Sequence, residues 1–157
     1  MKIFSYILKK DPQDYNTRAQ IMLAGSLAHS GLLGLGREED WASHFIVHEI
    51  GALYDETHGI TLSIVFPVWM KYVYKTNLDR FVQFAKRVFQ VSTDGKTRED
   101  IALEGIYRFE GFLKELGLPT SFKEAGLPTD KIHLMAEKVT ENGPLGRFKK
   151  TGKRGCN

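Results

Sequence analysis

Apolar residues recur along this chain at the spacing of three to four residues that is typical of an amphipathic helix. The clearest stripe comprises Ala102, Gly105, Ile106, Phe109, Phe112, Leu113 and Leu116. An earlier stripe comprises Tyr15, Ala19, Met22, Leu23, Ser26, His29 and Leu33. Helices with one apolar face bury it against other helices, and no segment reads as a convincing strand. The pattern predicts an all-α fold, a helical bundle.

Capping and helix-breaking residues indicate where these helices begin and end. Asp11 and Pro12 are expected to begin the earlier helix as its N-cap and first-turn proline. The glycine-rich segment 31–36 is expected to end it in a turn. Thr97 with Asp100 predicts a capping box before the later helix. A last helix is expected over about 130–140.

Residues 61–74 form a strongly apolar segment that contains one proline, Pro67. Its length and its all-round hydrophobicity predict a buried central helix, which Pro67 should kink or restart. Core packing is the favoured interpretation for most of six side chains that could also line a substrate pocket: Phe66, Trp69, Met70, Tyr72, Val73 and Tyr74. The bundle is therefore expected to form around this element.

The composition is that of a globular protein, with 42% hydrophobic and 26% charged residues in a chain of 157. The net charge of +3 arises from a basic C-terminal end, which includes Lys153 and Arg154. We expect a helical metal-binding domain over 1–150 and a solvated, disordered basic tail over 151–157, with no nucleic acid bound. Cys156 is the single cysteine, which suits a reducing compartment. No apolar run is long enough to span a bilayer, so a cytoplasmic protein is the expectation.

Three of the five histidines lie in one short stretch, at positions 44, 48 and 58. His44 and His48 are four residues apart and would share one face of a helix. On a single unbroken helix, His44 and His58 would lie about 21 Å apart, too far for one ion to contact both. The polar segment 55–57 can supply a turn between them. The stretch predicts a helix, a tight corner and a second helix that begins at His58, with the spacing of a metal or proton-transfer site.

The histidines alone do not decide between that site and a structural role in the bundle. A histidine on an apolar helix face is more often a core or boundary residue than a metal ligand. The zincin motif is absent, because Ala52 stands where a second histidine would be needed after His48 and Glu49. Two histidines cannot hold a catalytic ion alone, since three or four ligands are usual. Other residues would have to complete the ligand shell.

The order of several short motifs carries a resemblance to a known family. These are Asn16-Thr17-Arg18-Ala19, Ala28-His29-Ser30-Gly31, Gly34-Leu35-Gly36, Asp40-Trp41-Ala42, His48-Glu49, His58-Gly59 and Ile64-Val65-Phe66-Pro67. In this order they resemble the C-terminal helical domain of iron-containing alcohol dehydrogenases, which have the dehydroquinate synthase-like fold. The NAD(P)-dependent butanol dehydrogenase type is the most similar branch. The resemblance covers nearly the whole chain, from about residue 11 to about residue 150.

The resemblance implies a role for each of the three clustered histidines. The first and last histidine of the family pattern bind the catalytic metal, which assigns His44 and His58 to a divalent ion, Fe²⁺ or Zn²⁺. The middle one lies close to the reacting carbon and the nicotinamide, which makes His48 the candidate catalytic residue, a proton relay. The implied reaction interconverts a small alcohol and its aldehyde by hydride transfer with NAD(P).

Family members also have an N-terminal nucleotide-binding domain, whose Gly-Gly-Gly-Ser loop binds the cofactor. The resemblance places the other two metal ligands, an aspartate and a histidine, just before the first residue of this sequence. NAD(P) is therefore expected to bind only together with that domain. The isolated chain is expected to be inactive without that domain, which either its own lost N-terminal part or a separate N-terminal-domain partner chain could supply.

Two alternatives remain open, and each is of a different class. The chain could be a stand-alone helical module that binds a metal or another protein. It could also be a non-functional truncated remnant whose exposed inter-domain face drives self-association. A homodimer is left open, as are the choice of alcohol or aldehyde, of NADH or NADPH, and of iron or zinc.

Overall fold

The computed structural model describes residues 2–36 and 38–146, and its regular elements in these ranges are all helical. The all-α prediction is confirmed. The chain divides into two compact units, Met1–Glu39 and Asp40–Asn157. No helix within the described ranges is long and apolar enough to cross a membrane. The expected basic tail over 151–157, with Cys156, lies outside the described residues, so the domain boundary at 150 stays a prediction.

The first unit contains helices α1 (Lys2–Lys10) and α2 (Tyr15–His29) and the short 3-10 helix η1 (Leu32–Gly34). The N-cap of α2 is Asp14, whose carboxylate accepts the Thr17 N–H at 2.7 Å, so the predicted start at Asp11 and Pro12 is wrong. Asp11 instead belongs to the turn after α1, because its own N–H donates to the Ile7 carbonyl at 2.8 Å. The Asp11 side chain also accepts the Gln13 N–H at 3.0 Å, a second hydrogen bond within that turn.

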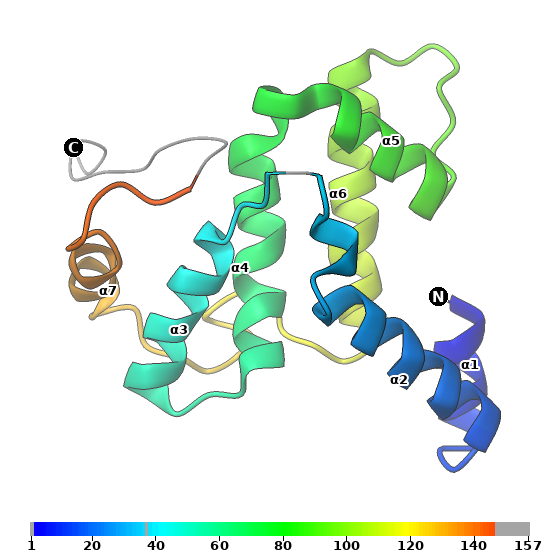
Figure 1. The fold of residues 1–157 in the computed structure, drawn as a ribbon, viewed down its shortest axis with the longest axis horizontal. Coiled ribbons are helices and arrows are strands. Elements are labelled where there is room, and N and C mark those ends of the chain that lie inside the picture. The colour runs from blue at the N-terminus through cyan, green and yellow to red at the C-terminus, as the bar shows by residue number, and fades with distance from the viewer. Residues whose placement is uncertain (1, 37, 147–157) are drawn as a thin grey trace. The chain divides into compact units, whose positions relative to one another are not determined.

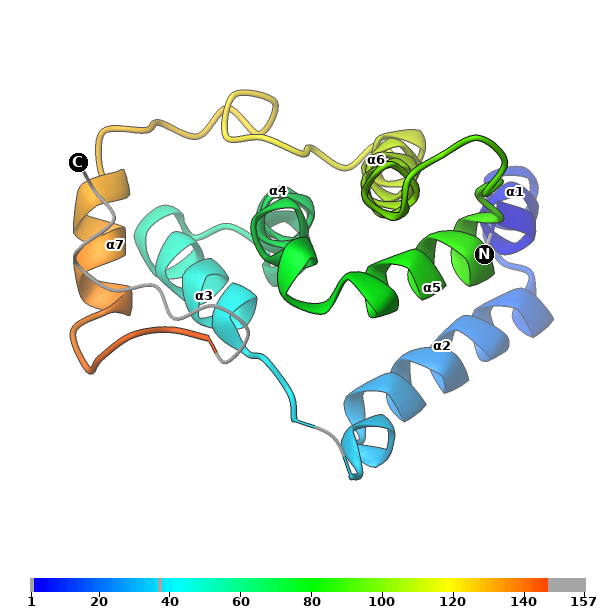
Figure 2. The same ribbon diagram turned by 90° about the horizontal axis from the view of Figure 1, so that it is seen from above.

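The second unit is a bundle built around one central helix, α4 (His58–Val73). The other helices are α3 (Ala42–Tyr54), α5 (Leu78–Phe89), α6 (Arg98–Glu115) and α7 (Ile132–Val139), with the 3-10 turn η2 (Tyr74–Asn77) between α4 and α5. Helix α4 packs between α3 and α6, α7 covers α3, and α5 packs on α6 (Figure 1 and Figure 2). The histidine-bearing helices α3 and α4 are thus neighbours.

Three apolar clusters hold this unit together. The first joins α3, α4 and α7 through Val47, Ile50, Val65 and Met135. The second joins the C-terminal end of α4 and η2 to α6 through Met70, Tyr74, Ala102 and Ile106. The third joins α5 to α6 through Ala85, Val91 and Ile101. Helix α4 contributes to two of the three, which confirms that it is the central buried element.

Pro67 lies within α4 without ending it, because the helix continues to Val73. The alternative that the proline restarts the helix is therefore wrong. Pro67 is among the fully buried side chains of the molecule. A proline removes one helical hydrogen bond, and burial of α4 between two other helices offsets that loss. Core packing is confirmed for Met70 and Val73 of this helix and for Tyr74 of η2, which are buried, whereas Phe66 and Tyr72 are exposed.

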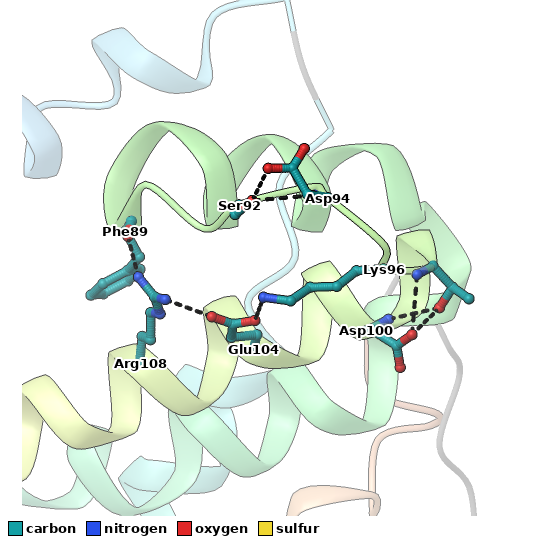
Figure 3. Close-up of polar contacts among 8 residues, drawn as sticks. Phe89, Ser92, Asp94, Lys96, Asp100, Glu104 and Arg108 are labelled. Atoms are coloured by element: carbon teal, nitrogen blue, oxygen red, sulfur yellow. Dashed lines mark hydrogen bonds and ion pairs between the residues drawn. The ribbon is translucent and has the colours of Figure 1, made fainter.

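Polar contacts fasten the connection between α5 and α6 to α6 itself (Figure 3). Thr97 and Asp100 form the predicted capping box, with the Thr97 N–H donating to the Asp100 carboxylate at 3.1 Å. The Glu104 carboxylate accepts from Lys96 at 2.5 Å and from Arg108 at 2.6 Å. The other terminal guanidinium nitrogen of Arg108 donates at 2.9 Å to the carbonyl of Phe89, which is the last residue of α5. This network closes the C-terminal end of α5 onto α6.

Candidate metal centre

The corner between α3 and α4 brings the clustered histidines together. Asp55 ends α3 with a left-handed backbone conformation, at φ 50°. Thr57 is the N-cap of α4, and its N–H donates to the Glu56 side chain at 2.8 Å. His58 is the first residue of α4, as the sequence predicts. The predicted order of helix, tight corner and second helix is confirmed.

Backbone contacts fix the position of His58 in the first turn of α4. The hydroxyl group of Thr61, a fully buried residue, donates to the His58 carbonyl at 3.0 Å. The Thr61 N–H donates to the Thr57 carbonyl at 3.1 Å and so begins the helical hydrogen bonding. Because Thr61 is buried in the core, its hydrogen bond holds the backbone of His58 at the edge of that core.

Four aromatic rings follow one another in space at this corner. The ring centroids of Trp41 and His44 are 5.0 Å apart, with an interplanar angle of 72°. Those of His44 and His58 are 5.4 Å apart, and those of His48 and His58 are 5.5 Å apart. His58 therefore lies within reach of both histidines of α3. His44 is half-buried, whereas His48 and His58 are exposed.

The separation of these imidazoles suits a shared divalent ion. Two imidazoles bound at about 2.1 Å to one tetrahedral ion place their ring centroids about 5 Å apart. The 5.4 Å between His44 and His58 fits this arrangement. The pair formed by His48 and His58 has nearly the same separation, so the distance alone does not choose between the pairs. In either pair, neutral imidazoles are suitable donors for Fe²⁺ or Zn²⁺.

The described residues supply only part of a ligand shell. Within 2–36 and 38–146, no three side chains of His, Cys, Asp or Glu are arranged so that they could hold an ion together. A catalytic metal usually has three or more protein ligands. The described residues therefore bring imidazoles together at this corner, and an ion held there would need further ligands.

Sequence reasoning did not assign a role to Trp41, which the structure places against His44. The sequence could have indicated this contact, because residues three apart are neighbours around a helical turn.

A tyrosine makes a contact at the other end of α3, where the Tyr54 hydroxyl donates to the Pro128 carbonyl at 3.1 Å. Burial and the nearby Asp130 raise the pKa of Tyr54, so it remains a neutral donor that anchors the segment before α7.

Comparison with known proteins identifies the family. Residues 5–155 match the model of the Fe-containing alcohol dehydrogenase family, C-terminal. The chain belongs to the iron-containing alcohol dehydrogenase family. Among its relatives in this family, it is 38% identical over 149 residues to the probable NADH-dependent butanol dehydrogenase 2 of Bacillus subtilis. That alignment covers 93% of this chain and 38% of the relative.

Two further iron-containing alcohol dehydrogenase relatives agree with this membership. The NADH-dependent butanol dehydrogenase A of Clostridium acetobutylicum is 36% identical over 149 residues, which cover 93% of this chain and 38% of that protein. The crystal structure of NADH-dependent butanol dehydrogenase A from Thermotoga maritima superposes with a TM-score of 0.86 at 37% identity. It covers 94% of this chain and 39% of the solved one. The chain thus spans less than two fifths of the length of these relatives.

Proposed function

We propose that this chain is the metal-binding helical part of an alcohol dehydrogenase that interconverts a small alcohol and its aldehyde with NAD(P). The observation that carries this proposal is the separation of 5.4 Å between the His44 and His58 rings, across a corner that joins two helices. Membership of the iron-containing alcohol dehydrogenase family supports the reaction class. The butanol dehydrogenases among the relatives support a small alcohol as the substrate.

In this proposal His44 and His58 bind a divalent ion, Fe²⁺ or Zn²⁺, through neutral ring nitrogens. The bound ion supplies Lewis-acid chemistry at the oxygen of the alcohol or aldehyde. The packing of α3 against α4 places both imidazoles at the same corner before an ion arrives, because each helix is anchored in the first apolar cluster. Such preorganisation reduces the ordering cost of binding.

His48 is the proposed catalytic residue, which holds and relays a proton. It is exposed, so its ring can exchange a proton with water. Its ring centroid lies 5.5 Å from that of His58, which keeps it next to the proposed metal pair. The nicotinamide of NAD(P) supplies the hydride chemistry when it is bound. The role of His48 is to move the proton that accompanies the hydride.

We further propose that these 157 residues turn over alcohol only together with a nucleotide-binding domain. The two imidazoles of the described residues are fewer than the ligands of a usual catalytic centre, which supports this part of the proposal. Self-association as a homodimer is compatible with it. A cytoplasmic location, supported by the single cysteine, completes the proposal.

Calorimetric titration of the chain with Fe²⁺, under anaerobic conditions, and with Zn²⁺ tests the metal pair. The single variants His44→Ala, His48→Ala and His58→Ala are compared with His133→Ala, which removes an exposed histidine of α7. We expect binding to be lost in His44→Ala and His58→Ala and retained in the other two. Loss in His48→Ala with retention in His44→Ala would instead assign the ion to His48 and His58.

The same titration separates the proposal from its alternatives. A stoichiometric, tight complex in a monomeric chain would favour a stand-alone metal-binding module. Equal binding in all four variants, or none in the unaltered chain even when a nucleotide-binding domain is added, would contradict the proposed site.

A further inference from the structure

Trp41 occupies a fixed position beside the proposed metal ligand His44. Its ring meets the imidazole edge to face, with centroids 5.0 Å apart and an interplanar angle of 72°. This T-shaped arrangement is a favourable geometry for a pair of aromatic rings. Trp41 is the N-cap of α3 and His44 lies in the first turn of that helix, three residues further on, so the two side chains are neighbours.

The backbone around Trp41 is held on both sides. The Asp40 carboxylate accepts the Ala42 N–H at 2.8 Å, and the Trp41 carbonyl accepts the Phe45 N–H at 3.1 Å. The next two residues, Ala42 and Ser43, are buried. The backbone from which the indole projects is therefore held in place.

Burial in the core does not account for this tryptophan, since 48% of its surface is exposed. The part that is covered includes the side of the indole that meets His44. On its other side His44 lies next to His58, and the two ring centroids are 5.4 Å apart. The imidazole of His44 is thus bounded by the indole as well as by the second proposed ligand, and rotation of its ring would break one contact or the other.

We propose that Trp41 is a positioning residue: its indole holds the His44 imidazole in the orientation in which His44 and His58 share a divalent ion. This inference rests on the proposed function, because it requires those two histidines to be the ligands. Trp41 itself contacts no substrate in this proposal. It acts by limiting the rotation of His44, which lowers the cost of ordering that side chain when an ion binds.

The test uses Ni²⁺ as the probe and the full chain as the protein, with affinity measured by calorimetry. Trp41→Ala should weaken Ni²⁺ binding about three- to tenfold, the range expected when an aromatic pair is lost. Trp41→Phe should restore most of the affinity, because a phenyl edge can meet the imidazole in the same way. The matched control is Phe45→Ala, which removes another exposed aromatic residue four residues further on, in the first turn of α3.

Fluorescence gives a second readout, which reports whether the bound ion lies close to Trp41. The chain has two tryptophans, and Trp69 lies on α4 about 16 Å along the helix from His58. In Trp69→Phe, only Trp41 remains, and Ni²⁺ should quench its emission in a saturable manner. In Trp41→Phe, the remaining emission should change little. His44→Ala in the Trp69→Phe background should abolish the quenching.

The outcomes separate this inference from the proposed function. Unchanged Ni²⁺ affinity in Trp41→Ala, with affinity lost in His44→Ala and His58→Ala, would overturn the role of Trp41 alone. Unchanged affinity in the two histidine variants would overturn the proposed function, and the role of Trp41 with it. If Trp41→Ala loses helix by circular dichroism, Trp41→Leu replaces it, and equal affinities for Trp41→Leu and Trp41→Phe would overturn the positioning role.

Discussion

Gly105 of α6 lies so close to Ala85 of α5 that a side chain added at Gly105 would overlap the Ala85 methyl group. A Cβ built at this position would lie 2.8 Å from the Ala85 Cα, which is backbone and cannot rotate away. Both residues are fully or nearly fully buried in the packing of α5 on α6. The absence of a side chain at 105 is therefore what allows these two helices to approach each other.

Gly105→Ala should destabilise the second unit by about 1–3 kcal/mol, the usual cost of overpacking a core. Urea unfolding followed by circular dichroism measures this change. The matched control is Gly111→Ala in the same helix, where an added Cβ meets no atom within 4 Å. That variant should stabilise by about 0.5–1 kcal/mol, because alanine is the better helix former. Destabilisation of equal size in both variants would contradict the close approach at Gly105.

Glu104 should make the stability of the α5–α6 connection dependent on acid. Hydrogen bonds from Lys96 first, and then from Arg108, hold the pKa of its carboxyl group below the ordinary value. A carboxylate whose pKa is lowered on folding contributes stability that is fully present above the unfolded pKa and is lost as the pH falls through the folded one. The urea midpoint should therefore fall as the pH drops below about 4.3.

Glu104→Gln should be less stable than the unaltered chain near pH 7 and should lose less stability on acidification. Glu137→Gln, a change of the same kind on the exposed face of α7, should leave the acid dependence as it is. The measurement is the urea midpoint of each variant at a series of pH values. Parallel pH profiles for Glu104→Gln and the unaltered chain would refute the role of this carboxylate.

Ser63 ties the segment after α6 to the central helix. Its hydroxyl group lies 2.6 Å from the Pro119 carbonyl and 2.7 Å from the Ile60 carbonyl, and the residue is buried. Ser63→Ala would leave the Pro119 carbonyl without this donor, which should cost about 1–3 kcal/mol. Ser92→Ala, at an exposed turn, is the comparison and should change the free energy of unfolding far less. A similar loss of unfolding free energy in the two variants would be evidence against a stabilising hydrogen bond from Ser63 to Pro119.

His48 should affect turnover and not metal binding. With the nucleotide-binding domain of a butanol dehydrogenase supplied as a separate chain, we expect butanol oxidation to be measurable by NADH absorbance. His48→Gln should lower kcat about 10²- to 10⁴-fold, the usual contribution of a positioned proton-transfer group. His133→Gln serves as the control. A loss of Zn²⁺ affinity in His48→Gln would show that His48 is a ligand and would reverse its assigned role.

Local patterns were sufficient to predict the features that depend on neighbouring residues. The Thr97–Asp100 capping box and the corner before His58 follow from hydrogen bonds and turns that span only a few residues. Asp11 shows the limit of such reasoning, because it reads as an N-cap but is already used in the turn after α1. The competing choice, Asp14, lies only three residues away, and either aspartate satisfies the same local rule.

Features that depend on distant segments could not be predicted in this way. The contact between Gly105 and Ala85 requires the position of α5 relative to α6, which no local pattern specifies. The pairing of the His44 and His58 rings requires both the corner and the packing of α3 on α4. The spacing of the histidines indicated that they could converge, and only the structure gives the separation of their rings.

The corner between α3 and α4 comprises only Asp55, Glu56 and Thr57. If one residue were inserted there and α4 shifted its register by one position to accommodate it, every residue of α4 would move by about 100° around the helix axis and by about 1.5 Å along it. That shift would carry His58 away from α3. If α4 instead kept its packing, the extra residue would have to bulge out beside the imidazoles. The length of this corner therefore limits which insertions and deletions a metal-binding form of the domain can tolerate, whereas the longer connection between α5 and α6 can vary in length without moving any of the three imidazoles.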